Sequence, residues 1–356
     1  MANVLIEEST LTSIANAVRS ALGSTDKMLM SSVASSISSI SAKIPPNGKK
    51  WSRCSYSLAK KFQCVHYANG LWVAGGVSYG LWYSTNGISW TQSNNTSSTI
   101  TGVHYANGLW VACGTSGVHY STDGKSWTIS DLAINTISAY NAAGLWVACA
   151  NGGLFYSTNG INWSQSNIVE GAFNRVHYAN GLWVTSGSSG LYYSTDGMNW
   201  TKTDITIASL SGRSCTYYAN GLWVTTATSK LYYSTDGMNW TKCTLPSGIY
   251  VGSQAIYNAN GIWVVACGNG LLYSTDGITW NKSNITSGTM YDVYNANGMW
   301  VACCGSSTNK GIYYSTDGKS WTKGFSSYES FAVYNANGIW VVGCNANYGL
   351  AYSKSA

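Results

Sequence analysis

The residues that could carry out chemistry are few and scattered. Of the 356 residues, 13 are Asp or Glu, and neither zinc-ligand spacing nor a phosphate-binding glycine loop occurs. Hydrolysis of a glycosidic bond needs two carboxylates that face one sugar across a set distance. In the repeated part of the chain, the carboxylates outside the repeated motifs described below fall in different repeats: Asp131, Glu170, Asp204, Asp292 and Glu329. The sequence therefore predicts no catalytic residue, no metal site and no cofactor, and we expect a protein that is not an enzyme.

Histidines and cysteines repeat in register, which favours packing roles. His66, His104 and His177 precede a repeated Tyr, where other repeats hold Ala139, Tyr217, Ile256, Val293 and Val333. A position that accepts Ile and Val is interpreted as a packing position rather than a metal ligand. Six cysteines follow a repeated W-V core by a step or two: Cys113, Cys149, Cys267, Cys303, Cys304 and Cys344. Their spacing favours buried free thiols over disulfides.

Composition excludes several classes of protein. Charged residues make up 9% of the chain, against roughly 25% in ordinary soluble proteins, yet no run of 18 apolar residues predicts a membrane span. The 17 Trp and 26 Tyr exclude disorder. The net charge of +6 comes from scattered Lys and Arg, so nucleic acid is not an expected partner.

Two aromatic strings repeat along most of the chain with a mean spacing of about 38 residues. The first, Y-x-N-G-L-W-V, has its tryptophan at Trp72, Trp110, Trp146, Trp183, Trp223, Trp263, Trp300 and Trp340. The second, Y-S-T-[DN]-G-x-x-W, ends at Trp90, Trp127, Trp163, Trp200, Trp240, Trp280 and Trp321. Asn-Gly and Asp-Gly between aromatic and β-branched runs indicate tight hairpins. Two hairpins per unit predict a four-stranded blade, and hence an all-β propeller.

The last copy is incomplete, because the chain ends shortly after Tyr352-Ser353 without the turn and final Trp. The missing half, N-G-x-x-W, occurs at Asn47 to Trp51. We therefore predict an eight-bladed propeller over residues 47–356, closed by an N-terminal strand that pairs with the last strand. Such closure removes the free sheet edges that invite aggregation.

The strings S-T-D-G-K-S-W (Ser121 to Trp127) and S-T-D-G-M-N-W (Ser194 to Trp200) resemble the Asp-box of bacterial neuraminidase repeats. The resemblance covers seven of the eight blades and implies a fold rather than an activity. We expect the Asp side chain to accept backbone N–H bonds within its own turn, a role that Asn86 and Asn159 can also fill.

The resemblance makes a sialidase-like glycosidase the enzyme hypothesis. Sialidases are similar in having an arginine triad, a Tyr nucleophile with a Glu partner, an F-R-I-P-like string and six blades. This chain has four arginines, Arg19, Arg53, Arg175 and Arg213, and lacks that string. We therefore rank catalysis well below binding.

Comparison of the eight copies indicates a binding face. The A-N-G and T-[DN]-G turns are nearly identical, whereas the second-to-third turns and the connections between blades differ in every copy. In a four-stranded blade the varying loops share one face, which we call the variable rim, and loops are where binding residues concentrate. Its Asn, Ser, Thr and aromatic side chains suit sugars or a protein epitope. The predicted ligand-binding residues are Tyr79, Asn95, Phe173, Arg175, Arg213, Lys230, Tyr250, Tyr291, Asp292, Lys310, Tyr328 and Tyr348.

Residues 1–46 differ in composition and contain no Trp, Tyr, Phe or Cys. Helical spacing of Leu11, Ile14 and Val18 predicts one helix, and a second is expected before Pro45-Pro46. The string EESTLTSIANAVRSALGSTDKML resembles the amino-terminal segment of tail-associated proteins from phages and prophages of Gram-positive bacteria. That resemblance implies a module for attachment to other tail proteins or for homo-oligomerisation.

Together these features predict a non-enzymatic phage tail receptor-binding or adhesion protein. Its expected partner is a host-surface glycan or envelope protein. The N-terminus does not read as a signal peptide, so we expect assembly in the bacterial cytoplasm and a place in the virion tail. A bacterial propeller that scaffolds protein–protein interaction is the alternative.

Overall fold

The computed structural model describes residues 48–55, 60–95, 98–205, 215–227, 230–252, 255–306 and 309–354. Gly48–Lys354 forms one compact unit. The helices predicted within residues 1–46 lie outside the described residues, as does Arg213.

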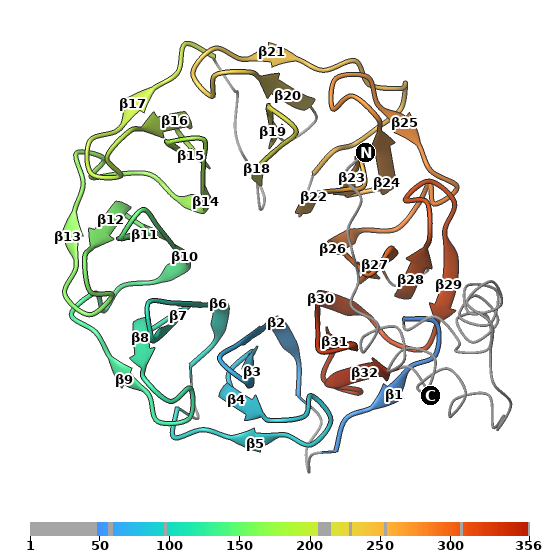
Figure 1. Ribbon diagram of the computed structural model, residues 1–356, viewed down its shortest axis with the longest axis horizontal. Coiled ribbons are helices and arrows are strands. Elements are labelled where there is room, and N and C mark those ends of the chain that lie inside the picture. Colours follow the sequence, from blue (N-terminus) through green and yellow to red (C-terminus); the bar gives the residue numbers. More distant parts are fainter. Residues whose placement is uncertain are drawn as a thin grey trace, which may run out of the picture. The chain divides into compact units, whose positions relative to one another are not determined.

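The compact unit consists of eight four-stranded antiparallel sheets arranged around a common axis (Figure 1). The prediction of an all-β, eight-bladed propeller is therefore confirmed. Blades 1 to 8 are numbered along the chain by their innermost strands. These strands are β2 (Phe62–Ala68), β6 (Ile100–Ala106), β10 (Thr136–Ala142), β14 (Phe173–Ala179), β18 (Thr216–Ala219), β22 (Ala255–Ala259), β26 (Met290–Ala296) and β30 (Ser330–Ala336).

Three further strands complete each blade toward the outside of the ring. The second strands are β3 (Leu71–Gly76), β7 (Leu109–Gly114), β11 (Leu145–Ala150), β15 (Leu182–Gly187), β19 (Leu222–Ala227), β23 (Ile262–Cys267), β27 (Met299–Cys304) and β31 (Ile339–Cys344). The third strands are β4 (Gly80–Ser84), β8 (Gly117–Ser121), β12 (Gly153–Ser157), β16 (Gly190–Ser194), β20 (Lys230–Ser234), β24 (Gly270–Ser274), β28 (Gly311–Ser315) and β32 (Leu350–Lys354). The outer strands are β5 (Thr91–Gln92), β9 (Thr128–Ile129), β13 (Ser164–Gln165), β17 (Thr201–Lys202), β21 (Thr241–Lys242), β25 (Asn281–Lys282), β29 (Thr322–Phe325) and β1 (Ser52–Arg53).

The two ends of the unit close blade 8. Strand β1 pairs with β32, with Ser52 opposite Tyr352, and Figure 1 shows the two strands side by side. The Gly48 amide donates to Ser353 Oγ (2.9 Å), and Trp51 Nε1 donates to the Gly48 carbonyl (3.0 Å). The predicted closure by an N-terminal strand is thus confirmed.

The A-N-G turns have a backbone that few residues adopt readily. Asn69 has a φ of 48° and Gly70 a φ of 74°, which is the pair of positive angles that a type I′ hairpin turn needs. Blade 3 carries Ala143 at the Asn position, with a φ of 50°. Alanine lacks the short polar side chain that makes this region tolerable for Asn, so blade 3 has the weakest of these turns.

The core lies between the blades, where it forms eight apolar clusters. The tryptophans of the first string, here called the inner tryptophans, are each at most 2% exposed. None of the ten cysteines forms a disulfide, and all except Cys64 are buried. The prediction of buried thiols, made for six of them, is confirmed.

The loops that vary between copies lie together on one side of the ring. Among the described residues, the second-to-third turns of seven blades each bond to a blade connection. The Gly80 amide, for example, donates to the Ser98 carbonyl (2.8 Å), and the Asn345 amide donates to the Glu329 carbonyl (3.0 Å). The antiparallel strand order places the repeated turns on the opposite side. The variable rim is therefore a real surface of the fold.

Replacing Trp51 should loosen the ring closure. Trp51→Ala removes a half-buried indole from the cluster between blades 7 and 8 and should lower the free energy of unfolding by about 2 kcal/mol. Hydrogen exchange of the β32 amides should accelerate more than that of other blades. The matched control is Trp163→Ala, at the same position of an internal blade. Equal acceleration at β32 in both variants would contradict the assigned closure.

The A-N-G turn of blade 3 can be improved. Ala143→Asn should stabilise the protein by about 0.5–1 kcal/mol, because Asn adopts a positive φ at lower cost. The reciprocal change Asn180→Ala, at the same position of blade 4, should destabilise it by a similar amount. Denaturant unfolding measures the change in the free energy of unfolding for both variants. Changes of the same sign would show that the backbone angle is not the cause.

Candidate functional site

The polar side chains of the S-T-[DN]-G turns bond within their own turns. Ser121 Oγ accepts the Gly124 amide (2.8 Å), and Asp123 Oδ1 accepts the amides of Lys125 and Ser126 (2.8 Å each). Asn86 makes the same bonds in blade 1 at 2.9 Å. As predicted, the side chain acts as a local acceptor, and an amide replaces the carboxylate without change of geometry. These turns hold the fold and are not candidates for a site.

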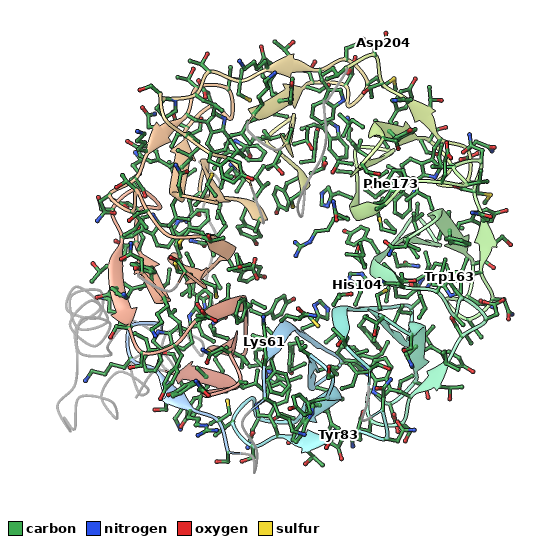
Figure 2. All side chains as sticks on the ribbon, turned by 180° about the vertical axis from the view of Figure 1, so that it is seen from behind. Lys61, Tyr83, His104, Trp163, Phe173 and Asp204 are labelled. Atoms are coloured by element: carbon green, nitrogen blue, oxygen red, sulfur yellow. The ribbon has the colours of Figure 1, made fainter. Side chains whose placement is uncertain are left out.

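The innermost strands place a ring of eight aromatic side chains around the axis. They lie six positions before each inner tryptophan, and we call them the aromatic collar: His66, His104, Tyr140, His177, Tyr217, Tyr257, Tyr294 and Tyr334. Figure 2 shows His104 at the inner edge of the ring and Trp163 near its periphery. The register that the sequence suggested for the histidines is therefore wrong by one residue in four blades, since Tyr140, Tyr257, Tyr294 and Tyr334 stand there, not Ala139, Ile256, Val293 and Val333.

The collar is a closed circle of ring contacts. Neighbouring centroids are 4.9 to 5.7 Å apart, from His66–His104 (5.5 Å) round to Tyr334–His66 (5.0 Å). An octagon of that side places the centroids about 7 Å from its axis. Each ring also meets an inner tryptophan of the next blade edge-on, as His66 does with Trp110 (6.0 Å). All eight collar residues are half-buried.

The collar carries no charge near neutral pH. Burial, with a smaller repulsion from His104, lowers the pKa of His66 to about 3. Burial lowers the pKa of His104 and of His177 to about 4. Burial, and to a lesser extent Tyr294, raises the pKa of Tyr334 to about 12. The collar therefore offers ring faces, imidazole nitrogens and hydroxyls to whatever enters the axis.

Rings of side chains also lie on either side of the collar along the axis. On the side of the A-N-G turns, every blade has alanine four positions before its inner tryptophan, as at Ala68 and Ala106. On the side of the variable rim, the residues eight positions before it form what we call the rim-side tier. Its members are Cys64, Gly102, Ser138, Arg175, Cys215, Ala255, Asp292 and Ala332. Two predicted ligand-binding residues, Arg175 and Asp292, thus belong to the innermost strands beside the axis rather than to the outer loops.

Two predicted aromatic residues are well exposed on the variable rim. Tyr250 is 51% exposed, and Tyr79 is 39% exposed. The Tyr250 ring lies against Gly268, where an added Cβ would come within 2.6 Å of Cδ1, so one part of the ring is held while the rest faces solvent. The Tyr250 amide donates to Asn269 Oδ1 (3.2 Å), which ties the connection to the adjacent turn. Lys60 Nζ lies 4.8 Å from the Tyr79 centroid.

Other predicted aromatic residues belong to packed clusters. Phe173 is fully buried and meets Tyr192 edge-on (5.5 Å), so its prediction as a ligand-binding residue is wrong. It begins β14 ahead of a bulge that turns its ring inward over Gly187. Tyr328 and Tyr348 stack on each other (4.6 Å), which leaves both half-buried. Tyr291 packs against Phe331 (5.1 Å).

The polar residues predicted to bind a ligand likewise include both exposed and half-buried side chains. Lys230 is exposed at the start of β20, and Lys310 is half-buried beside the third strand of blade 7. Asn95 is half-buried, and its carbonyl accepts the Leu81 amide (3.0 Å), so it serves chiefly as a strand connection. Asp292 accepts the amides of Val293 (3.0 Å) and Val333 (2.9 Å), which joins blades 7 and 8.

A set of inter-blade bonds was not predicted from the sequence. Asn94 accepts the Trp127 amide (2.7 Å) and donates to its carbonyl (3.1 Å), and Asp131 accepts the Trp163 amide (2.9 Å). Asn167 and Asn284 repeat the bond to the next blade. These residues stand four positions after the preceding tryptophan of the second string, so alignment of the copies on that tryptophan could have found them. Asp131 is therefore a structural residue.

Searches for two other kinds of site give negative findings. Among the described residues, no three His, Cys, Asp or Glu side chains come together as metal ligands would. The described part of the chain also has no helix long and apolar enough to cross a membrane.

Comparisons with known proteins identify the fold. The sequence matches no family model and no curated protein. The structure resembles BamB from Moraxella catarrhalis, with a TM-score of 0.62 and 10% identity over 85% of this chain and 97% of that one. The likeness is to a β-propeller.

Two further propellers show a similar likeness. A computationally designed protein, Ika8, has a TM-score of 0.67 with 10% identity over 85% of this chain and 98% of its own. A catalytically inactive virginiamycin B lyase from Staphylococcus aureus, with quinupristin, has a TM-score of 0.57 with 10% identity over 86% and 99% of the two chains. At such identities the fold alone is shared.

Stability should fall on mild acidification because of the collar histidines. Their folded pKa values of about 3 to 4 lie below the unfolded value of about 6.5, so the unfolded chain binds more protons below pH 6.5. Stability is full above pH 6.5 and should drop by about 2 kcal/mol per histidine between pH 7 and pH 5. Denaturant unfolding at the two pH values measures the loss. Replacing all three with Tyr, the residue of the other five blades, should flatten the profile, and an unchanged slope would contradict the assignment.

Proposed function

We propose that this propeller is a non-enzymatic binding protein whose variable rim recognises a glycan or another component of a bacterial surface. We further propose that it works as a phage tail receptor-binding or adhesion protein, assembled in the bacterial cytoplasm and attached to other tail proteins through residues 1–46. The observation that carries the proposal is the contrast between the two sides of the ring.

The two sides of the ring differ in how much their sequence varies between blades, although all blades share one backbone arrangement. The repeated turns on one side differ little between blades and bond internally, as at Ser121 and Asp123. The loops on the other side differ in every blade, although the strands that carry them superimpose in register. Variation confined to one surface of a repeated scaffold is typical of a surface that selects a partner.

The chemistry of the rim suits an uncharged, hydroxyl-rich ligand. Its connections are rich in Asn, Ser, Thr and Gly. Tyr250 and Tyr79 add exposed rings, and a ring can stack on the apolar face of a sugar while amides and hydroxyls bond to its hydroxyl groups. Because Tyr250 is held by Gly268 and the Asn269 bond, little conformational freedom is lost when a ligand covers it.

The carboxylates support binding rather than hydrolysis. Asp131 and Asp292 are engaged with backbone amides of the following blades. Glu170, Asp204 and Glu329 remain, and they lie on three different blade connections. A glycosidase pair needs two carboxylates opposed across one sugar, and the fold alone carries no activity.

Several copies on one particle would raise the strength of attachment. Individually weak contacts from each rim add up when many copies bind the same surface, because the later binding events become intramolecular. The proposed attachment through residues 1–46 would supply that multivalency.

Exposed rim tyrosines should contribute to attachment without supporting the fold. The double variant Tyr79→Ala, Tyr250→Ala should reduce binding of the full-length protein to host cells by at least tenfold, while the thermal midpoint changes by only about 1–2 °C. Binding of labelled protein to cells, measured by flow cytometry, gives the result.

The control for this experiment is Met238→Ala. The exposed fraction of Met238, 38%, is close to the 39% of Tyr79, but Met238 lies in an S-T-D-G turn on the opposite side of the ring. Loss of cell binding in this control alone would place the binding surface on the wrong side for our proposal. Binding that disappears after protease treatment of the cells, but not after periodate oxidation of their glycans, would favour the scaffold function instead.

A further inference from the structure

One exposed cation lies on the innermost strands next to the axis. In the rim-side tier, five of the eight residues are Gly, Ala or Cys, a sixth is Ser138, and the two that carry charge are Arg175 and Asp292. Arg175 is the only exposed member of the tier. Its short neighbours leave the long side chain free of steric competition around the axis.

The two charges of the tier have different roles. The Asp292 carboxylate accepts two backbone amides, one from its own strand and one from β30, so its oxygens bind the wall of the ring. Such bonds hold a carboxylate in place and reduce its availability to a ligand. The Arg175 guanidinium shares a side-chain hydrogen bond with Cys215, and its fork of five N–H donors fits planar oxyanions.

Side chains from several blades act on the Arg175 guanidinium. Desolvation by the surrounding strands lowers its pKa, but Cys215, Asp292 and Cys64 together raise it, and the net change is upward. These residues belong to blades 5, 7 and 1, and the last two are each three blades away from Arg175 around the ring. Arg175 is exposed and lies two residues before His177, on the same face of β14 as the collar ring that borders the axis.

The collar lies directly beneath this cation. Along each innermost strand the collar ring is two residues from the rim-side tier, on the same face of the strand. Arg175 is followed by His177, whose neighbours in the collar are Tyr140 (5.7 Å) and Tyr217 (5.2 Å). A single guanidinium thus stands over a floor of uncharged, partly exposed rings.

We propose that the rim side of the axis is a binding site for an anionic glycan group, with Arg175 pairing with the carboxylate or phosphate and collar rings contacting the sugar. This inference rests on the proposed function and narrows it to ligands that carry an oxyanion. Among the described residues of the collar and the rim-side tier, Arg175 is the one cation, and we assign to it the selection for charge. A carboxylate and a phosphate share the recognition chemistry, and the experiment separates the two sources.

The test compares full-length wild-type protein with Arg175→Gln on an array of three glycan sets: neutral, uronic-acid-containing and phosphate-containing. Wild-type protein should bind one or both anionic sets, and raising NaCl from 50 to 500 mM should weaken that binding at least tenfold. Arg175→Gln should bind at least tenfold more weakly and lose most of the salt dependence. The matched control is Lys282→Gln, which removes an exposed positive charge from outer strand β25 and should leave binding unchanged.

The remaining outcomes are decisive as well. Selective binding of neutral glycans by the wild-type protein, or unchanged binding of anionic glycans by Arg175→Gln, overturns the axial site while the rim proposal stands. Binding to no glycan of any set overturns the glycan-binding function itself. If Arg175→Gln does not fold, Arg175→Lys replaces it in the comparison, because Lys keeps the charge but lacks the planar fork of donors. The salt dependence of binding by the wild-type protein can be measured without any variant.

Discussion

The burial of one indole per blade is the interaction on which this ring depends. Each inner tryptophan lies between the glycine of its own closing turn and an aromatic ring from the preceding blade. For Trp110, a Cβ added to Gly124 would lie 3.1 Å from Nε1, and His66 meets the indole edge-on at 6.0 Å. Two features favour glycine at this position: its φ is 70°, and an added Cβ would lie 2.5 Å from Leu71 Cδ2 of the preceding blade as well as close to the indole. One buried side chain therefore couples a turn, a blade and its neighbour, and removal of such a group from a protein core typically costs about 3–5 kcal/mol.

Because these contacts repeat at every interface between blades, they stabilise the ring without the loops, and the two sides of the ring differ in how much their sequence can vary. The side of the repeated turns stays constant, since Ser, Asp or Asn, Gly and Trp must all be present to form the turn and pack it. The loops of the variable rim are joined by backbone bonds, such as Gly80 to Ser98, which fix the path of the chain without requiring a particular side chain. Sequence can change there at little cost in stability, and that freedom makes the rim available for recognition.

The repeat made the blade count, the ring closure and the variable rim predictable, because each follows from turn chemistry that is local in sequence. Positions that depend on contacts between blades were less accessible. The collar was placed one residue off in four blades, since the repeated Tyr served as the reference, and Tyr itself moves between the two adjacent positions, as Tyr67 and Tyr140 show. Phe173 looked like a rim residue, but a bulge turns it into the core. Asp131 and Asp292 were interpreted as available carboxylates, because the amino-acid sequence does not reveal their hydrogen bonds to backbone amides of another blade.

The bulges explain why a distinctive residue can occur at the axis of so regular a ring. In blades 1, 2, 3, 4, 7 and 8 the pairing of the first two strands shifts just before the rim-side tier, as between Phe173 and Arg175. Below the bulge the strands pair without interruption, and the collar and alanine rings repeat because each member must fit its neighbours. At the bulge the strict repetition ends, and the tier accepts Gly, Cys, Ser, Ala, Asp and Arg without disturbing the ring. The fold thus keeps the axis uniform where its side chains pack against one another and allows it to differ at the rim-side tier, where Arg175 and Asp292 are the two charged residues among six uncharged ones.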